Sequence, residues 1–197
     1  MYVPDAFRQD DRECLFGLAK AYPFATLFTY DEGEPRVSHL PLCVDLPRGV
    51  IRGHLARQNP QYEALASGTH VLAIFHGPHG YVSPSVYVEH PSVPTWNYVV
   101  VHAYGRARIV DEDGLRSILE ETVARFDESD WRLDTGEEFL RPMLEAIAGF
   151  EITVERLEGK WKLSQNRSPQ EQARVAAWLE RGDDSSRALA AFMKPRR

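Results

Sequence analysis

The stretch PTWNYVVVHAYGRARI, residues 94–109, decides the fold, because it alternates throughout with the period of two that a β-strand requires. One face of this strand carries a tapering, mostly apolar series, namely Asn97, Val99, Val101, Ala103, Gly105, Ala107 and Ile109. The other face mixes aromatic rings, an imidazole and two guanidiniums, on Trp96, Tyr98, Val100, His102, Tyr104, Arg106 and Arg108. The first face predicts packing on a narrow interior. The composition of the second face is typical neither of a hydrophobic core nor of a solvent-exposed surface.

Other strand-like segments are separated by turn-forming residues. The segment DEGEP joins two alternating runs into a predicted hairpin, and LPRG turns the chain into a third strand. The run THVLAIFHG is apolar at nearly every position, so we expect a fourth strand buried on both faces. A long Gly/Pro-rich connection over 77–94 should follow it. The predicted strands besides 94–109 are 23–30, 36–45, 50–55, 69–77 and 150–164.

Helices are marked by their caps. Asp111 predicts the start of a helix that runs to about Phe126, and Thr135 with Glu138 forms a capping box for a helix ending near Gly149. The segment SPQE at 168–171 opens a final amphipathic helix that ends at Gly182. Shorter helices are predicted over 13–22, 59–68 and 185–193. Together the segments indicate an α+β protein built around a small antiparallel barrel of about six strands.

Composition restricts the classes of function. No apolar run approaches the roughly 20 residues that cross a bilayer, and the acidic N-terminal stretch lacks the pattern of a signal peptide, so we expect a cytoplasmic protein without a membrane span. Two cysteines without metal-ligand spacing predict structural thiols. The net charge of −6 argues against generic nucleic-acid binding. Residues 156–197 nevertheless hold ten Lys/Arg against five Asp/Glu, a basic portion that suits DNA or an anionic ligand.

The segment GHLARQNPQ, 53–61, has more polar side chains than a turn requires. If a helix begins near Asn59, then Arg57, Gln58 and the amides of the first helical turn converge on a positive helix end, where an anion or phosphate would bind. The alternative is that Arg57 is a surface residue and His54 a packed one.

The segment SHLP, 38–41, interrupts a strand with Pro41, which predicts a sheet edge or a bulge. An edge leaves backbone N–H and C=O groups for a flat heterocycle such as a flavin ring, with Ser38 and His39 alongside. Alternatively, His39 is an ordinary strand histidine with a satisfied imidazole.

The segment KWKLSQNRS, 160–168, joins the last strand to the last helix. Its cations and amides, on Lys162, Gln165, Asn166 and Arg167, either form a plain polar connection or cover a ring system and its phosphate. No nucleophile, paired acids or metal-ligand spacing stands out, so any chemistry is expected to come from a bound cofactor.

Five segments, SHLPLCVD, GHLARQNPQ, YVSPSVY, VPTWNYVVVHAYG and GKWKLSQNR, resemble the PaiB-like family of FMN-binding split-barrel proteins. The resemblance covers most of the chain in the family's order. It implies a six-stranded antiparallel split barrel with peripheral helices over residues 1–182, followed by a short helix and basic tail over 183–197. It also implies a homodimer with FMN in a cleft that both subunits form.

The same resemblance implies the cofactor contacts. Arg57 and Gln58 fall where split-barrel flavoproteins contact the phosphate, and Ser38 and His39 lie beside the ring, with His54 on the neighbouring strand. We expect Asn97 and the 162–167 segment, with Lys162, Gln165, Asn166 and Arg167, to complete the pocket. Trp96, Tyr98, His102 and Tyr104 would then face the partner subunit and the flavin cleft. The rival interpretation is that the helices of 111–149 cover that face.

Three functions follow as hypotheses. The resemblance implies a flavin-dependent oxidoreductase or a flavin-responsive negative regulator of transcription, since PaiB-like proteins are described as repressing protease synthesis and sporulation. DNA contact through the basic C-terminal portion, with or without a cofactor, is the second. Haem bound through a histidine, as in haem-utilising relatives of the split barrel, is the third.

Overall fold

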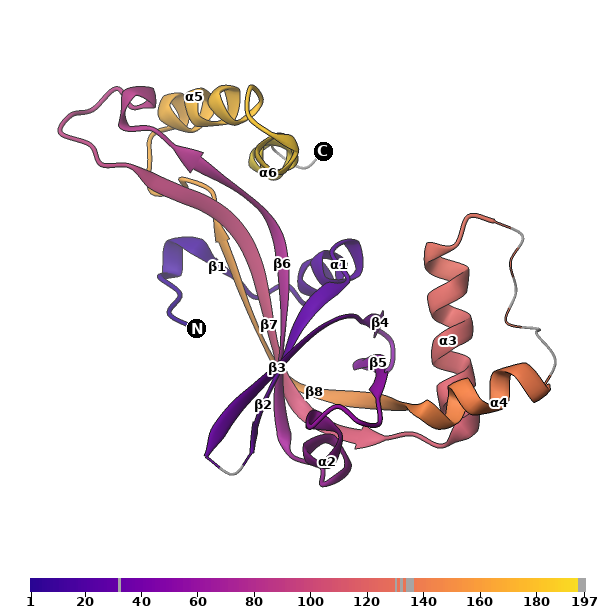
Figure 1. The fold of residues 1–197 in the computed structure, drawn as a ribbon. Helices are drawn as coiled ribbons and strands as arrows, with labels where there is room; N and C mark the ends of the chain where they lie inside the picture. Colours follow the sequence, from indigo (N-terminus) through magenta and orange to yellow (C-terminus); the bar gives the residue numbers. More distant parts are fainter. Residues whose placement is uncertain (32, 130, 132, 134–136, 195–197) are drawn as a thin grey trace. The chain divides into compact units, whose positions relative to one another are not determined.

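A computed structural model describes residues 1–31, 33–129, 131, 133 and 137–194. Figure 1 shows the elements along the chain. The strands are β1 (Arg8–Gln9), β2 (Phe24–Asp31), β3 (Glu34–Pro41), β4 (Cys43–Asp45), β5 (Val50–Ala56), β6 (His70–Val82), β7 (Thr95–Ile109) and β8 (Ile147–Lys162). The helices are η1 (Asp5–Phe7), α1 (Arg12–Ala21), α2 (Gln61–Ala66), η2 (Pro84–Val86), α3 (Glu112–Phe126), α4 (Glu137–Ala146), α5 (Pro169–Leu179) and α6 (Asp184–Met193).

The strands form one sheet whose order is β3-β2-β6-β7-β8-β5-β4, with β1 paired to β8. Its two end strands, β3 and β4, are separated along the chain by Leu42 alone. Both ends of the order therefore belong to one chain segment, which is the topology of a sheet that closes on itself. The predicted α+β barrel class is confirmed. The described residues contain eight strands rather than six, because β1 and β4 are very short and the sequence pattern does not resolve them.

The chain divides into two compact units. The first comprises Met1–Leu18, His76–Val101 and Glu158–Arg197, and the second comprises Ala19–Phe75 and His102–Leu157. The long strands β6, β7 and β8 run through both units, whereas α5 and α6 belong to the first and α3 and α4 to the second. Within the first unit, α5 and α6 pack against each other.

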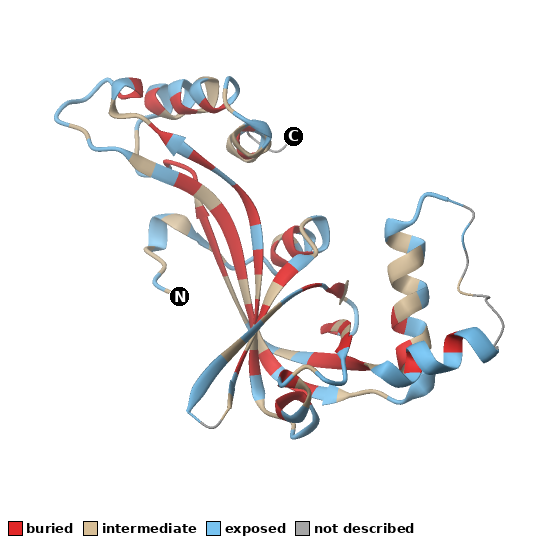
Figure 2. Cartoon of the chain, viewed as in Figure 1, coloured by how far each residue is buried: buried red, intermediate tan, exposed pale blue. Residues whose placement is uncertain are grey.

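The alternation of β7 is confirmed. Its predicted inward face, from Asn97 to Ala107, is buried at every second residue, as the red segments of the strand in Figure 2 show. Gly105 is required there, since a Cβ at this position would lie 2.0 Å from the carbonyl oxygen of Thr153 on β8.

Side chains on the second face of β7 contact side chains of the neighbouring strand β8. In the second unit, the guanidinium of Arg156 lies 3.6 Å from the ring centroid of Tyr104, and Arg106 pairs with Glu155 at 3.5 Å. The rival interpretation placed the helices of 111–149 on this face. The helix α3 packs on β4 and β5, and its Leu115 and Ile118 lie next to Gly149 of β8.

The fourth strand differs from its prediction in two ways. β6 is not buried on both faces: buried residues alternate with exposed or half-buried ones from His70 to His76. It also continues through Gly77 and Pro78 to Val82, so the connection that was expected over 77–94 begins only at Ser83. The glycines that indicate a turn in the sequence here permit close packing, because a Cβ on Gly77 would lie 2.4 Å from Val99 Cγ2.

The helix caps were predicted correctly at α3 and α5. Asp111 accepts a hydrogen bond from the Gly114 N–H at 2.9 Å, and Ser168 accepts one from Glu171 at 3.3 Å. α4 ends at Ala146, three residues before Gly149, because β8 already begins at Ile147. The predicted cap Thr135 lies outside the described residues.

The carboxylate of Glu171 does more than cap α5. It accepts hydrogen bonds from the backbone N–H groups of Val88 at 3.0 Å and Glu89 at 3.2 Å, which attach the loop after η2 to the helix. These bonds, that of Glu89 foremost, hold the pKa of Glu171 below its ordinary value.

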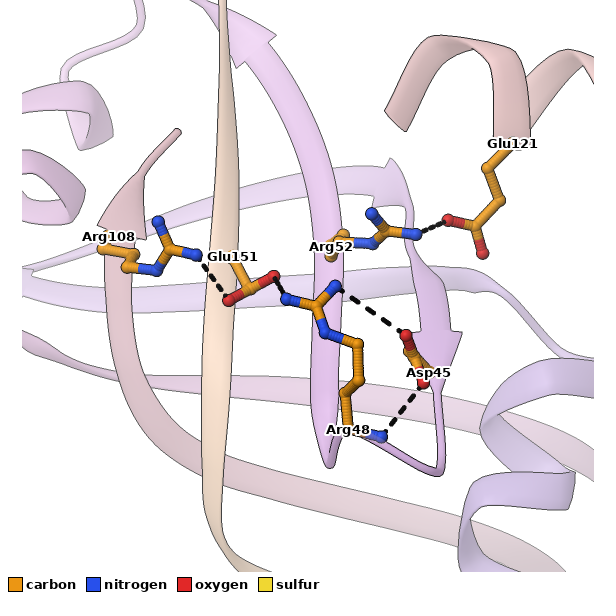
Figure 3. Close-up of polar contacts among 6 residues, drawn as sticks. All are labelled: Asp45, Arg48, Arg52, Arg108, Glu121 and Glu151. Carbon is orange, nitrogen blue, oxygen red and sulfur yellow. Dashed lines mark hydrogen bonds and ion pairs between the residues drawn. The ribbon is translucent and has the colours of Figure 1, made fainter. Parts of the chain in front are cut away.

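An ion-pair network joins β7, β8 and the β4–β5 turn (Figure 3). The carboxylate of Glu151 is nearly inaccessible and accepts hydrogen bonds from Arg108 at 2.8 Å and Arg48 at 3.0 Å. Beside it, Arg52 pairs with Glu121 of α3. The Glu151 network thus attaches β7 and β8 to the β4–β5 turn, and the separate Arg52–Glu121 pair attaches α3 to β5.

Candidate flavin-binding site

The segment Arg57–Gln61 is attached to the β2–β3 hairpin by two side-chain amides. Asn59 Nδ2 donates to Ser38 Oγ at 2.8 Å, and Asn59 Oδ1 accepts from the Gln61 N–H at 2.9 Å. Gln61 is buried, and its Nε2 donates to the carbonyls of Leu27 and Arg36 and to Thr29 Oγ1 at 3.1–3.3 Å. Sequence analysis missed Gln61, because a glutamine in the first turn of a short helix looks like a surface residue.

The outer edge of β3 offers backbone groups next to this segment. β3 ends at Pro41 and stands first in the sheet order, as the SHLP motif predicts. Gln61 Nε2 donates to the Arg36 carbonyl of β3 and also to Leu27 and Thr29 of β2, so this side chain bonds both strands of the hairpin. Because backbone groups alternate between the two edges of a strand, every second residue of β3 directs its N–H and C=O to the edge that β2 does not pair. A planar heterocycle could bond to such groups.

The two candidate histidines have different surroundings. His39 is exposed and follows Ser38 on β3, so its side chain points to the opposite face, where Nδ1 lies 3.2 Å from Thr26 Oγ1. His54 is half-buried on β5, and burial lowers the pKa of its imidazole. His54 is therefore neutral at pH 7, which matches the packed alternative.

Arg57 and Gln58 are exposed directly after β5. The Arg57 guanidinium lies 5.7 Å from the ring centroid of Tyr62 and donates to the Tyr62 hydroxyl at 3.3 Å. Arg57 also lines a hollow of about 310 Å³ beside α3 and α4, whose other charged walls are Asp111, Glu112, Arg116, Arg141 and Glu145. The helix α2 has only six residues and its Gln61 N–H is already bonded, so side chains rather than a helix end supply the anion donors.

The remaining candidates lie in the first unit and surround a buried amide. Asn97 is buried on β7, and its Nδ2 donates to Ser164 Oγ at 2.9 Å. Among the described residues, no partner reaches Asn97 Oδ1. Ser164 is also buried and has φ = 64°, a left-handed conformation that non-glycine residues seldom adopt. Strained backbone of this kind is common at ligand sites.

The 162–167 segment folds back on itself around this amide. Lys162 Nζ donates to Thr95 Oγ1 and to the Trp96 carbonyl, and burial, followed by the charge of Lys160, lowers its pKa. Gln165 bonds the Leu163 N–H and the Trp161 carbonyl. Arg167 lies 4.3 Å from the ring centroid of Tyr87, whereas Asn166 is exposed. Lys162, Gln165 and Arg167 thus shape the loop.

The residues of the second unit fit a phosphorylated ring. The side chains of Arg57 and Gln58 are exposed hydrogen-bond donors, and the Ser38 hydroxyl, which accepts from Asn59, can still donate its own proton. Within the described ranges, no cluster of His, Cys, Asp and Glu is arranged to hold a metal ion. No helix in the described part of the chain is long and apolar enough to span a bilayer.

This geometry agrees with the comparison to known families. Residues 1–156 match the family model described as "Putative FMN-binding domain". The chain belongs to the PaiB-like family of FMN-binding split-barrel proteins, as the resemblance implied.

Two curated relatives are similar along most of their length. "Protease synthase and sporulation protein PAI 2" of Bacillus subtilis (strain 168) is 32% identical over 98% of this chain and 97% of its own. An uncharacterized protein of Emericella nidulans is 31% identical over 81% of each chain.

Solved structures share the fold at low sequence identity. The "FAD and Heme binding protein from Mycobacterium smegmatis" superposes with a TM-score of 0.66 at 19% identity, over 84% of this chain and 78% of that one. The "Flavocytochrome Anf3 from Azotobacter vinelandii" has a TM-score of 0.65 at 17% identity, over 85% and 75%. At these identities, the similarity establishes the fold alone.

Proposed function

We propose that this protein binds FMN at the outer edge of β3. The observation that supports this assignment is the Asn59–Ser38 hydrogen bond, which keeps the segment after β5 against that edge. Arg57 and Gln58 then bind the phosphate, and the Ser38 backbone bonds the polar rim of the ring. When bound, FMN would supply electron transfer, and the chain's own residues would bind and orient it.

A titration of the metal-free, flavin-free protein with FMN, followed by flavin fluorescence, tests this assignment. Arg57→Ala should raise the Kd by about tenfold or more, since a charge-assisted hydrogen bond contributes roughly 1.5–3 kcal/mol. Arg106→Ala is the matched control, because Arg106 is also exposed but is engaged with Glu155 and the Gly68 carbonyl. Equal affinities of the two variants would exclude Arg57 as a phosphate ligand. A wild-type protein that ignores FMN would exclude the function.

We further propose that the protein is a homodimer through the outer face of β2 and β3. On that face the cross-strand pairs Phe24–Pro41, Phe28–Val37 and Tyr30–Pro35 surround the Thr26–His39 pair, and none of these residues is Asp, Glu, Lys or Arg. Phe24, Tyr30 and Val37 are large exposed apolar side chains. Such a contiguous patch suits a subunit interface. Val37→Asp should give a monomer by light scattering, and a monomeric wild-type protein would refute the assignment.

The five candidates of the first unit are proposed as further FMN contacts. Asn97 is the most informative of them, because its buried Oδ1 has no partner within the described ranges. Asn97→Ala should weaken FMN binding in the same titration, and an unchanged Kd would remove this group from the site. Lys162, Gln165, Asn166 and Arg167 can be tested in the same way.

The biological role that we infer is flavin-dependent oxidation–reduction or flavin-responsive regulation. The regulatory role is supported by the Bacillus subtilis relative, whose name refers to protease synthesis and sporulation. A salt-sensitive gel shift with upstream DNA would support direct DNA contact through the basic C-terminal portion. An absorption spectrum separates FMN from haem, since a Soret band on adding haem would favour haem.

A further inference from the structure

A second hollow lies within the first unit. None of the ten candidate FMN contacts lines it, although Trp96 in its wall directly precedes the candidate Asn97 on β7. It measures about 320 Å³ and opens where the end of β6, the start of β7 and the α5–α6 turn meet. Its walls include Tyr81, Trp96, Trp178, Arg181, Asp183 and Ser186. This volume is in the range of small-molecule sites.

Three aromatic rings stand around this hollow and remain partly exposed. Relative exposure is 53% for Trp96, 43% for Tyr81 and 39% for Trp178. The rings of Tyr81 and Trp96 meet edge to face, with centroids 6.0 Å apart. Trp178 Nε1 donates to the Tyr81 carbonyl at 2.9 Å, which fixes the indole in place. The rings are therefore held in position to stack on a planar molecule.

Two charged side chains line the hollow, Arg181 and Asp183. In the described part of the chain, no hydrogen bond or ion pair is found for the Arg181 side chain. The carboxylate of Asp183, by contrast, is committed to the Ser186 N–H at 2.8 Å as the cap of α6. Arg181 also borders a neighbouring hollow of about 250 Å³, on which Trp178 and Arg174 lie too. A ligand's negative group can thus pair with Arg181 while its ring contacts the aromatic side chains.

We propose that this hollow binds a planar aromatic ring that carries an anionic group, such as an aromatic carboxylate or a nucleoside phosphate. The aromatic side chains supply the contact area for the ring, and Arg181 selects the anion. Apart from Trp96, which was expected to face the flavin cleft, no residue of this hollow was assigned to the flavin site, so the proposal is tested on the flavin-free chain.

Isothermal titration calorimetry of the full chain without flavin tests the proposal with three probes: 2-naphthoate, its neutral analogue 2-naphthylmethanol, and AMP. We expect saturable binding of 2-naphthoate or AMP and much weaker binding of the alcohol. The anion with the lower Kd shows whether the hollow prefers an aromatic carboxylate or a nucleoside phosphate. Arg181→Gln should raise the Kd of the anion by about tenfold, the loss of roughly 1.5 kcal/mol for one charge-assisted bond. Arg8→Gln is the matched control, since Arg8 is also exposed but is paired with Asp5 and lines neither hollow.

A second variant separates binding from folding. Trp96→Leu should abolish binding of the anion while the far-UV circular dichroism and unfolding midpoint stay close to wild type, because the indole is half exposed. Equal binding of the acid and the alcohol, or no effect of Arg181→Gln, would overturn the proposal. Displacement of the anion by FMN would also overturn it, because the hollow would then be the flavin site. Failure to bind FMN at all would leave this titration unaffected.

Discussion

Replacement of Gly105 by alanine tests the closed sheet most directly. The new Cβ would lie 2.0 Å from the Thr153 carbonyl oxygen, 2.9 Å from the Thr153 carbonyl carbon and 3.0 Å from Ile152 Cγ2. An ordinary contact begins at 3.4 Å, so β7 and β8 would have to separate by about 1.4 Å at this point. The obstacle is backbone rather than a flexible side chain, so no rotamer change relieves the clash.

This geometry determines how far Gly105→Ala should reduce the free energy of unfolding. Overpacking a core usually reduces the free energy of unfolding by about 1–3 kcal/mol, and a backbone obstacle places Gly105→Ala at or above the upper end, about 3 kcal/mol. Domains of this size are stable by only about 5–15 kcal/mol. Gly17→Ala is the matched control: Gly17 is exposed within α1 and nothing lies within 4 Å of its new Cβ. It should stabilise the protein by about 0.5–1 kcal/mol.

Urea unfolding followed by circular dichroism compares the wild type with both variants at one protein concentration. Replacement of glycine by alanine is thus expected to lower the free energy of unfolding at Gly105 and to raise it at Gly17. If Gly105→Ala lay within about 0.5 kcal/mol of the wild type while Gly17→Ala stabilised as expected, then β7 and β8 could not approach as closely as described. The narrow closed sheet would then be wrong.

Three further perturbations test other contacts. Glu151→Gln should reduce the free energy of unfolding by about 2 kcal/mol, since it removes the negative charge that two guanidiniums share. Arg108→Gln should reduce it by less than about 1 kcal/mol, because that side chain is more than half exposed. Equal losses for the two variants would contradict the network. Asn59→Ala should raise the Kd for FMN by about tenfold by releasing the segment from β3, and a wild-type affinity would show that the hydrogen bond does not position the site. The lowered pKa of Glu171 stabilises the fold fully above the ordinary glutamate pKa of about 4.3, and this stabilisation is lost as pH falls through the lower folded-state pKa. Thermal unfolding of Glu171→Gln should therefore differ from wild type at pH 7 and converge with it near pH 2, and a difference independent of pH would contradict this role.

The parts of the fold that follow local rules were predictable. The strand at 94–109 alternates over a long stretch, and the caps Asp111 and Ser168 accept the hydrogen bonds that their positions require. The continuation of β6 past Gly77 was not predictable. Whether a glycine ends a strand or permits close packing depends on what lies across from it, and here the neighbour is Val99 on β7, more than twenty residues away in sequence.

The candidate site was also predictable only in part. The sequence does not say which polar residues of a motif stabilise the fold and which face a ligand. In the segment 57–61, Asn59 and Gln61 are consumed by hydrogen bonds to the β2–β3 hairpin and its neighbours. Among the polar residues of the segment, Arg57 and Gln58 keep their side chains exposed. Two polar residues of the motif, Asn59 and Gln61, thus attach the loop to the hairpin. The other two, Arg57 and Gln58, can bind a phosphate. Substitution of the first pair should therefore lower both stability and affinity, and substitution of the second should lower affinity alone.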